Sequence, residues 1–114
     1  FDTVLCWYNC AMKEPEEHIF PHAVAHGTGV VIMSASRQEK LFPAPDAPGP
    51  AMEDFYRYVL SHPAVHVTLM ALRSTERFRR VAQALAERDR LSPEEQRHLE
   101  AYGSGMRAAG LLEL

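Results

Sequence analysis

The stretch His22–Ser36, which reads HAVAHGTGVVIMSAS, decides the fold of this chain. It contains a helical pattern up to His26, and then Gly27, the residue most typical of the position just after a helix. The apolar run Val30-Val31-Ile32-Met33 follows, rich in β-branched side chains. A short continuous apolar run of this kind is typical of a strand buried on both faces of a parallel sheet. The stretch therefore predicts a helix that leads into a parallel strand.

Two further apolar runs have the same character, Val4–Tyr8 and Val65–Leu72. Helical patterns lie between and after the strands, and we expect helices over residues 19–26, 52–61, 75–88 and 92–102. The order is strand, helix, strand, helix, strand, helix, helix. Strands that alternate with helices predict an α/β fold with a parallel sheet.

The last two helices carry start signals. Ser74 is a plausible N-cap for the first of them. In the second, Ser92 and Glu95 form a capping-box pattern, with Pro93 at the first helical position and an end near Gly103. The helix over residues 75–88 has an expected core face made of Phe78, Val81, Ala82 and Leu85.

The composition limits the class of protein. The chain has 114 residues, enough for one domain, and 46% of them are hydrophobic and 24% charged. A net charge of -3 gives no broad basic surface for nucleic acid, so we expect no nucleic-acid partner. No apolar run approaches the roughly 20 residues of a membrane helix. The two cysteines, Cys6 and Cys10, form no disulfide framework and favour a reducing, cytoplasmic location.

Three histidines, His18, His22 and His26, are spaced four residues apart, which on one helix would place them on a single face. A metal site is one interpretation. Pro21 opposes it, because proline is tolerated in the first turn of a helix and not in its interior. The helix then begins close to Pro21, His18 falls at or outside its edge, and two imidazoles alone make a poor zinc site. We expect solvated histidines on a helix face.

The predicted sheet needs a cover. Three strand–helix units cannot close a barrel, and helices on one side leave the other face of the sheet bare and apolar. A contiguous exposed apolar face is unusual for a monomer. The chain also begins at Phe1 rather than Met, inside a strand pattern. We therefore expect a fragment whose sheet is covered by the remainder of a barrel or by another copy.

Four stretches resemble a known family. They read FDTVLCWYN (1–9), IFPHAVAHGTGVVIMSAS (19–36), FYRYVLSHPAVHVTLMALRSTERF (55–78) and LSPEEQRHLEAYG (91–103), and in this order they are similar to the C-terminal portion of an aldo-keto reductase. The resemblance covers almost the whole chain. It implies that residues 1–114 are the C-terminal part of a single barrel domain whose N-terminal part is absent. That part would comprise the last three βα units plus the C-terminal helix of a (β/α)8 TIM-type barrel.

The resemblance also implies a function. Aldo-keto reductases reduce carbonyl groups of aldehydes and ketones by hydride transfer, usually from NADPH, at the C-terminal face of the barrel. The family's catalytic Asp, Tyr, Lys and His come from earlier strands, so this part alone would be inactive and would contribute the cofactor site.

Five residues fall at positions of that cofactor site. Met33 and Ser34, at the end of a strand, would flank the nicotinamide and the pyrophosphate. Arg73, Ser74 and Arg77, around the start of the next helix, would hold the adenosine 2′-phosphate, since a guanidinium suits phosphate recognition. The alternatives are that the arginines are ordinary surface residues and that Ser34 only ends the strand.

Other positions depart from the family's pattern. Leu5 replaces a glutamine that binds the nicotinamide amide, Met33 an aromatic ring, Ala71 a glycine, and Val81 an asparagine that contacts adenine. Methionine still offers a polarizable contact surface. The departures leave two alternatives open: a non-catalytic aldo-keto-reductase-like binding or regulatory protein, and a βα fragment that assembles with copies of itself.

Overall fold

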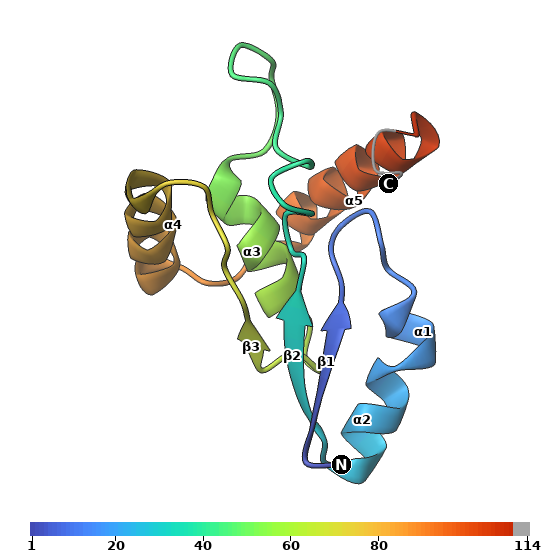
Figure 1. Cartoon of the computed structure of the whole chain (residues 1–114). Helices are drawn as coiled ribbons and strands as arrows, with labels where there is room; N and C mark the ends of the chain where they lie inside the picture. Colours follow the sequence, from blue (N-terminus) through green and yellow to red (C-terminus); the bar gives the residue numbers. More distant parts are fainter. Residues whose placement is uncertain (111–114) are drawn as a thin grey trace.

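The structure is a computed structural model that describes residues 1–110. Three strands form one parallel sheet in the order β1-β2-β3: β1 (Thr3–Trp7), β2 (Gly29–Met33) and β3 (Val67–Thr68) (Figure 1). Leu5 lies opposite Val31, and Val31 opposite Val67. The predicted parallel α/β arrangement is confirmed.

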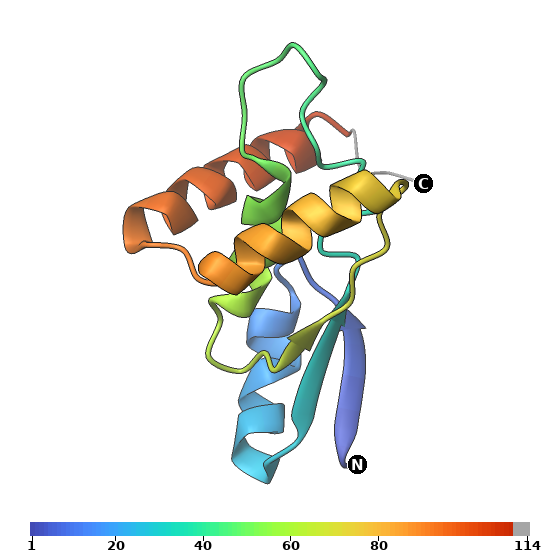
Figure 2. The same ribbon diagram turned by 90° about the vertical axis from the view of Figure 1, so that its left-hand side faces the viewer.

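The helices lie to one side of the sheet, as Figure 2 shows. They are α1 (Pro15–His18), α2 (Phe20–His26), α3 (Met52–Leu60), α4 (Thr75–Glu87) and α5 (Pro93–Ala108). Gly27 ends α2 in the left-handed conformation, with φ of 66°, as its place in the sequence predicted. Within residues 1–110 no helix is both long and apolar enough to cross a membrane.

The core lies between the sheet and the helices. Val30 and Ile32 of β2 are fully buried, and so is Val59 of α3, while Phe55 and Tyr56 of α3 are almost fully buried. Alternate residues of β2 face this core because successive side chains of a strand point to opposite faces. Each large apolar side chain buried here stabilises the fold by roughly 1.5–3 kcal/mol.

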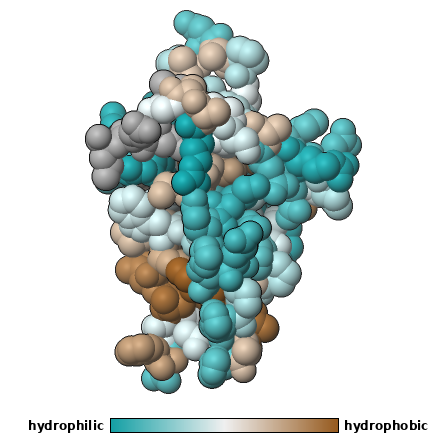
Figure 3. Space-filling view, turned by 90° about the vertical axis from the view of Figure 1, so that its right-hand side faces the viewer, coloured by the Kyte–Doolittle hydropathy of each residue, from teal (hydrophilic) through white to brown (hydrophobic). Residues whose placement is uncertain are grey.

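The opposite face of the sheet is bare and apolar. Leu5 and Trp7 of β1, Val67 of β3 and the following Leu69 are between 38% and 55% exposed. Leu5 shares a cross-strand row with Val31 and Val67. Figure 3 shows hydrophobic residues gathered at the surface in the lower part of that view. The expected uncovered sheet face is therefore present in the described residues.

The third strand is shorter than its apolar run. The sequence predicted a strand over Val65–Leu72, whereas β3 has two residues, Val67 and Thr68. Parallel hydrogen bonds extend one residue on each side, from the His66 amide to the Val30 carbonyl and from the Leu69 amide to the Ile32 carbonyl. Among residues 1–110 the strand has β2 as its single neighbour, and β2 ends at Met33, so the later residues of the run have no strand there to pair with.

Two helical predictions were wrong in detail, and one short helix was not predicted. α5 continues to Ala108 instead of ending near Gly103, because Gly103 lies inside the helix where it passes the Cys10 carbonyl. The short helix α1 was not predicted, although its Pro15 at the first helical position was a usable signal. Phe78 was expected in the core and is 45% exposed.

Candidate functional site

The candidate site lies at the edge of the sheet where all three strands end. β1 continues into Tyr8 and Asn9, β2 into Ser34, and β3 into residues 69–74, which lead to α4. Because the strands are parallel, these segments meet at the same edge (Figure 1). In α/β sheets and barrels, ligands bind at this carboxyl-terminal edge.

Tyr8 and Asn9 follow β1 but point into the protein. Tyr8 is 1% exposed, and its hydroxyl donates a hydrogen bond to Glu16 Oε2 at 2.6 Å. Burial raises the pKa of the Tyr8 phenol, and the bond to Glu16 raises it further. Asn9 is completely buried. Both side chains therefore belong to the core beneath the site and do not face a ligand.

The segment after β2 has an unusual backbone. Ser34 has a φ of 61°, and Arg37, Gln38 and Glu39 follow with φ values of 54°, 57° and 66°. This left-handed region is costly for residues other than glycine, by about 1–3 kcal/mol each. Such strain persists only where surrounding contacts fix the chain, and it concentrates at functional sites. The loop between β2 and α3 is therefore held in a specific shape.

Glu39 connects this loop to the start of α4. Its side chain is 6% exposed, and its Oε2 accepts a hydrogen bond from the Arg73 backbone amide at 2.6 Å. Its Oε1 forms an ion pair with Nη1 of Arg77. The Arg73 guanidinium is more distant, with Nε 3.8 Å from Oε2. Sequence reasoning missed Glu39, and no local signal in RQEK separates it from an ordinary surface acid.

The structure brings together three of the five predicted site residues, Arg73, Ser74 and Arg77. Ser74 caps α4, and its Oγ accepts a hydrogen bond from the Arg77 amide at 3.1 Å. The two arginine side chains are exposed by 77% and 47%. The prediction of Ser74 as an N-cap is confirmed.

A groove of ≈ 490 Å³ opens beside these residues, between α4 and the loop over residues 42–50, which contains four prolines. Four basic side chains line it, from Lys40, Arg73, Arg77 and Arg80. The acidic side chains near them are Glu39, on the groove wall, and Glu53, whose carboxylate is 3.7 Å from Arg80. Clustered cations next to a helix N-terminus favour an anionic ligand, phosphate above all.

Met33 and Ser34 lie apart from this groove, at the end of β2. Both are partly exposed. Met33 lies opposite Trp7 in the sheet, and the guanidinium of Arg37 covers the Trp7 ring at 4.8 Å from its centroid. Within residues 1–110 no hydrogen bond or ion pair joins Ser34 directly to Arg73 or Arg77; the connection runs through the loop that carries Glu39.

Val81 and Leu5, two of the residues that differ from the aldo-keto reductase pattern, have defined locations in the structure. Val81 is fully buried on the inner side of α4, so its side chain belongs to the core. Leu5 is 55% exposed on the bare face of the sheet. Neither side chain offers a polar contact to a ligand in the groove.

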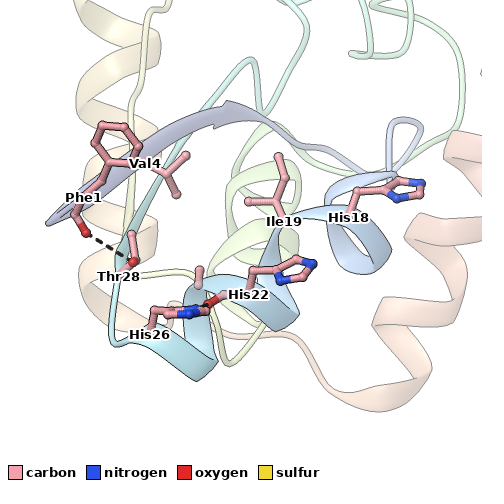
Figure 4. A pocket seen from close by; sticks show the side chains of 8 residues that line it. Phe1, Val4, His18, Ile19, His22, His26 and Thr28 are labelled. Atoms are coloured by element: carbon pink, nitrogen blue, oxygen red, sulfur yellow. Dashed lines mark hydrogen bonds between the residues drawn. The ribbon is translucent and has the colours of Figure 1, made fainter.

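The histidines line a separate hollow of ≈ 640 Å³ between the start of β1 and helices α1 and α2 (Figure 4). His18 ends α1, whereas His22 and His26 belong to α2, so the row of three is interrupted as Pro21 predicted. Nδ1 of His26 is 2.8 Å from the carbonyl oxygen of His22. In residues 1–110 no three His, Cys, Asp or Glu side chains are arranged to hold a metal ion.

Both cysteines are free thiols. Cys10 is 1% exposed, and burial raises its pKa to about 12. A thiol with so high a pKa is a weak nucleophile at neutral pH, because the thiolate is the reactive form. Cys10 is a core residue, next to Gly103 of α5.

The architecture is similar to that of solved aldo-keto reductase structures. The apo form of the aldo-keto reductase AKR11C1 from Bacillus halodurans matches with a TM-score of 0.70 and 22% identity, over 90% of this chain and 43% of that one. Its holo form matches with a TM-score of 0.69 and 23% identity, over 88% of this chain and 42% of that one. The sequence matches no family model and no curated protein.

These matches establish the fold. Over the matched part of the chain the architecture is that of part of an aldo-keto reductase, an α/β fold derived from a TIM barrel. The chain spans about two fifths of the length of the structures that it matches, with 43% and 42% covered.

Proposed function

We propose that this chain forms the cofactor-binding portion of an NADP-dependent oxidoreductase that reduces aldehydes or ketones by hydride transfer. The observation that supports the proposal most is the basic groove at the start of α4, with the exposed guanidinium groups of Arg73 and Arg77 on its wall. NADPH differs from NADH by one phosphate on the adenosine ribose. A pair of arginines beside a helix N-terminus suits that phosphate.

In this proposal, two separate groups of residues would bind different parts of the cofactor. Arg77 and Ser74 would hold the 2′-phosphate, with Arg73 at the mouth of the groove. Ser34, after β2, would face the pyrophosphate, and Met33 would pack against the nicotinamide through its polarizable thioether. When bound, NADPH supplies the hydride; the residues of this chain bind and orient it.

The same proposal accounts for the bare sheet face. Residues 1–114 would be the last three βα units and the C-terminal helix of a (β/α)8 barrel, and the rest of the barrel, or a second copy, would cover Leu5, Trp7, Val67 and Leu69. The catalytic Asp, Tyr, Lys and His, and most of the substrate pocket, would come from that remainder. The 114 residues alone would then bind nucleotide without turning over a carbonyl substrate.

A non-catalytic aldo-keto-reductase-like binding protein is the second candidate. Two observations favour it: Leu5 presents an apolar side chain where the family uses a glutamine amide, and Val81 is buried where the family uses an asparagine on adenine. Both changes remove polar contacts to a dinucleotide while leaving the phosphate groove in place.

Titration with NADPH and NADH, followed by cofactor fluorescence, tests the main proposal. In Arg77→Ala we expect NADPH binding to weaken about tenfold or more, because a charge-assisted hydrogen bond to phosphate is lost. NADH binding should change little. Arg79→Ala is the matched control, since Arg79 is an exposed arginine of the same helix that does not line the groove.

Two results would contradict the proposal. Equal loss of NADPH and NADH in Arg77→Ala would remove Arg77 from the 2′-phosphate site. Failure of both nucleotides to bind the unsubstituted protein at near-millimolar concentration would favour the non-catalytic alternative.

A further inference from the structure

Among residues 1–110, Glu39 is the acidic residue that lines the groove of the candidate phosphate site. Its side chain is 6% exposed, and its carboxylate accepts a hydrogen bond from the Arg73 amide while it forms an ion pair with Arg77. A carboxylate and a phosphate bind a guanidinium in the same way, through oxygens that face its planar N–H donors. Glu39 therefore makes with Arg77 the type of contact that a phosphate would make.

We propose that Glu39 is a specificity-determining residue: it acts as an internal competitor for Arg77 and limits the preference of the site for a 2′-phosphorylated adenosine nucleotide. The inference rests on the proposed function. An incoming phosphate must either take the Nη1 group that Glu39 uses or bind next to a carboxylate that lacks solvent to screen it. Either way, Glu39 weakens the binding of the phosphorylated nucleotide and leaves the unphosphorylated one unaffected.

The backbone adds to this role. Glu39 is the last residue of the left-handed run that begins at Arg37. The strained backbone of this segment therefore helps to fix the position of the Glu39 carboxylate, a constraint that a side chain on a flexible surface loop would lack. The Ser36 hydroxyl accepts a hydrogen bond from the Glu39 amide at 3.1 Å and fixes the segment further. Displacing the Glu39 carboxylate would therefore move residues 37–39 as a unit.

Such a movement would have an optical signal. Arg37 lies over Trp7, with its guanidinium carbon 4.8 Å from the ring centroid. Trp7 is the single tryptophan of the 114-residue sequence. A phosphate that displaces Glu39 would thus change the tryptophan fluorescence even though Trp7 itself is outside the groove.

The test compares adenosine 2′,5′-bisphosphate with adenosine 5′-monophosphate by calorimetry and by Trp7 fluorescence. Two variants remove the charge: Glu39→Gln keeps the shape, and Glu39→Asn tolerates the left-handed backbone better. Both should bind the bisphosphate at least roughly fivefold more tightly than the unsubstituted protein, with the monophosphate unchanged. Glu76→Gln is the control, because Glu76 is an exposed acid in the first turn of the same helix.

The possible failures are distinguishable. If the unsubstituted protein prefers the bisphosphate and the Glu39 variants bind it equally or more weakly, Glu39 positions Arg77 instead of competing for it, and the inference is overturned while the proposed function stands. An equal gain in Glu76→Gln would reduce the effect to net charge and also overturn it. If no protein distinguishes the bisphosphate from the monophosphate, the phosphate site itself is wrong, and both the inference and the proposed function fail.

Discussion

The side-chain amide of Asn9 donates a hydrogen bond to the Ser34 carbonyl at 2.9 Å and so joins the end of β1 to the end of β2. The Asn9 Oδ1 atom accepts from the backbone amides of Ala11 and Met12, at 2.9 and 2.8 Å. Asn9 thereby shapes the turn after β1 and holds Ser34 where it adopts its left-handed conformation. One buried amide thus sets two of the three strand ends that form the candidate site.

Replacing Asn9 should destabilise the fold. Asn9→Ala would remove three side-chain hydrogen bonds, those to the Ser34 carbonyl and to the amides of Ala11 and Met12. The Ser34 carbonyl keeps the Arg37 amide and the Met12 amide keeps the Asn9 carbonyl, whereas the Ala11 amide loses its partner, and we expect a loss of about 3 kcal/mol. Urea unfolding measures it as a lower midpoint with an unchanged slope. The control is Gln83→Ala, an exposed position of α4 away from the turn after β1, where a change within about 0.5 kcal/mol is expected. A loss in Asn9→Ala no larger than in the control would contradict the role given to Asn9.

The two glycines near the end of α5 should respond to alanine in opposite directions. A Cβ on Gly103 would lie 2.2 Å from the Cys10 carbonyl oxygen, whereas a Cβ on Gly105 would meet nothing within 4 Å. Gly103→Ala should therefore cost about 2 kcal/mol or more, since backbone on both sides must move. Gly105→Ala should stabilise α5 by up to about 1 kcal/mol through helix propensity. Thermal unfolding followed by circular dichroism checks both, and the same sign for both substitutions would refute the close approach of α5 to Cys10.

The helix ends also show which features the sequence could predict and which it could not. Local signals were reliable: Gly27 as a helix end, Ser74 and Ser92 as caps, and the parallel strands from their apolar runs. Gly103 misled, because a glycine needed for close packing looks the same in sequence as a glycine that ends a helix.

The candidate site divides in the same way. Arg73, Ser74 and Arg77 are neighbours along the chain, so their meeting was predictable once the helix start was known. Glu39 lies 34 and 38 positions before the two arginines that it contacts. Such long-range pairs depend on how the loop between β2 and α3 folds back. None of its left-handed residues is a glycine, so the sequence gives no local signal for this backbone conformation.

The start of α5 should lose stability in acid. Glu95 accepts hydrogen bonds from Arg88 at 2.7 and 3.1 Å and from the Ser92 amide at 2.9 Å. The bond to Arg88, and then that to Ser92, lower the pKa of Glu95 to about 2 from an ordinary 4.5. The ionised form is thus favoured in the folded state, so its contribution is complete above the ordinary value and disappears as the pH falls towards 2.

Thermal unfolding of Glu95→Gln between pH 7 and pH 2 tests this. The variant should be less stable than the unsubstituted protein at pH 7, and the two curves should converge at the acid end. Ser92→Ala is the control, because the lost cap should cost about 1 kcal/mol at both ends of the pH range. A constant offset for Glu95→Gln across the whole range would show that its charge does not contribute.

The bare sheet face should make the 114-residue chain associate with itself. Leu5, Trp7 and Val67 expose a contiguous apolar surface, and burying such a surface is favourable at roughly 25 cal/mol per Å². Sedimentation velocity should show a sedimentation coefficient that rises with concentration. Leu5→Lys and Val67→Lys should each shift the chain towards the monomer. Val24→Lys should leave association unchanged, because Val24 is equally apolar and 66% exposed but lies on α2, on the helical side of the sheet. A folded monomer at every concentration would show that this face needs no cover and would remove the main structural reason for expecting the rest of a barrel.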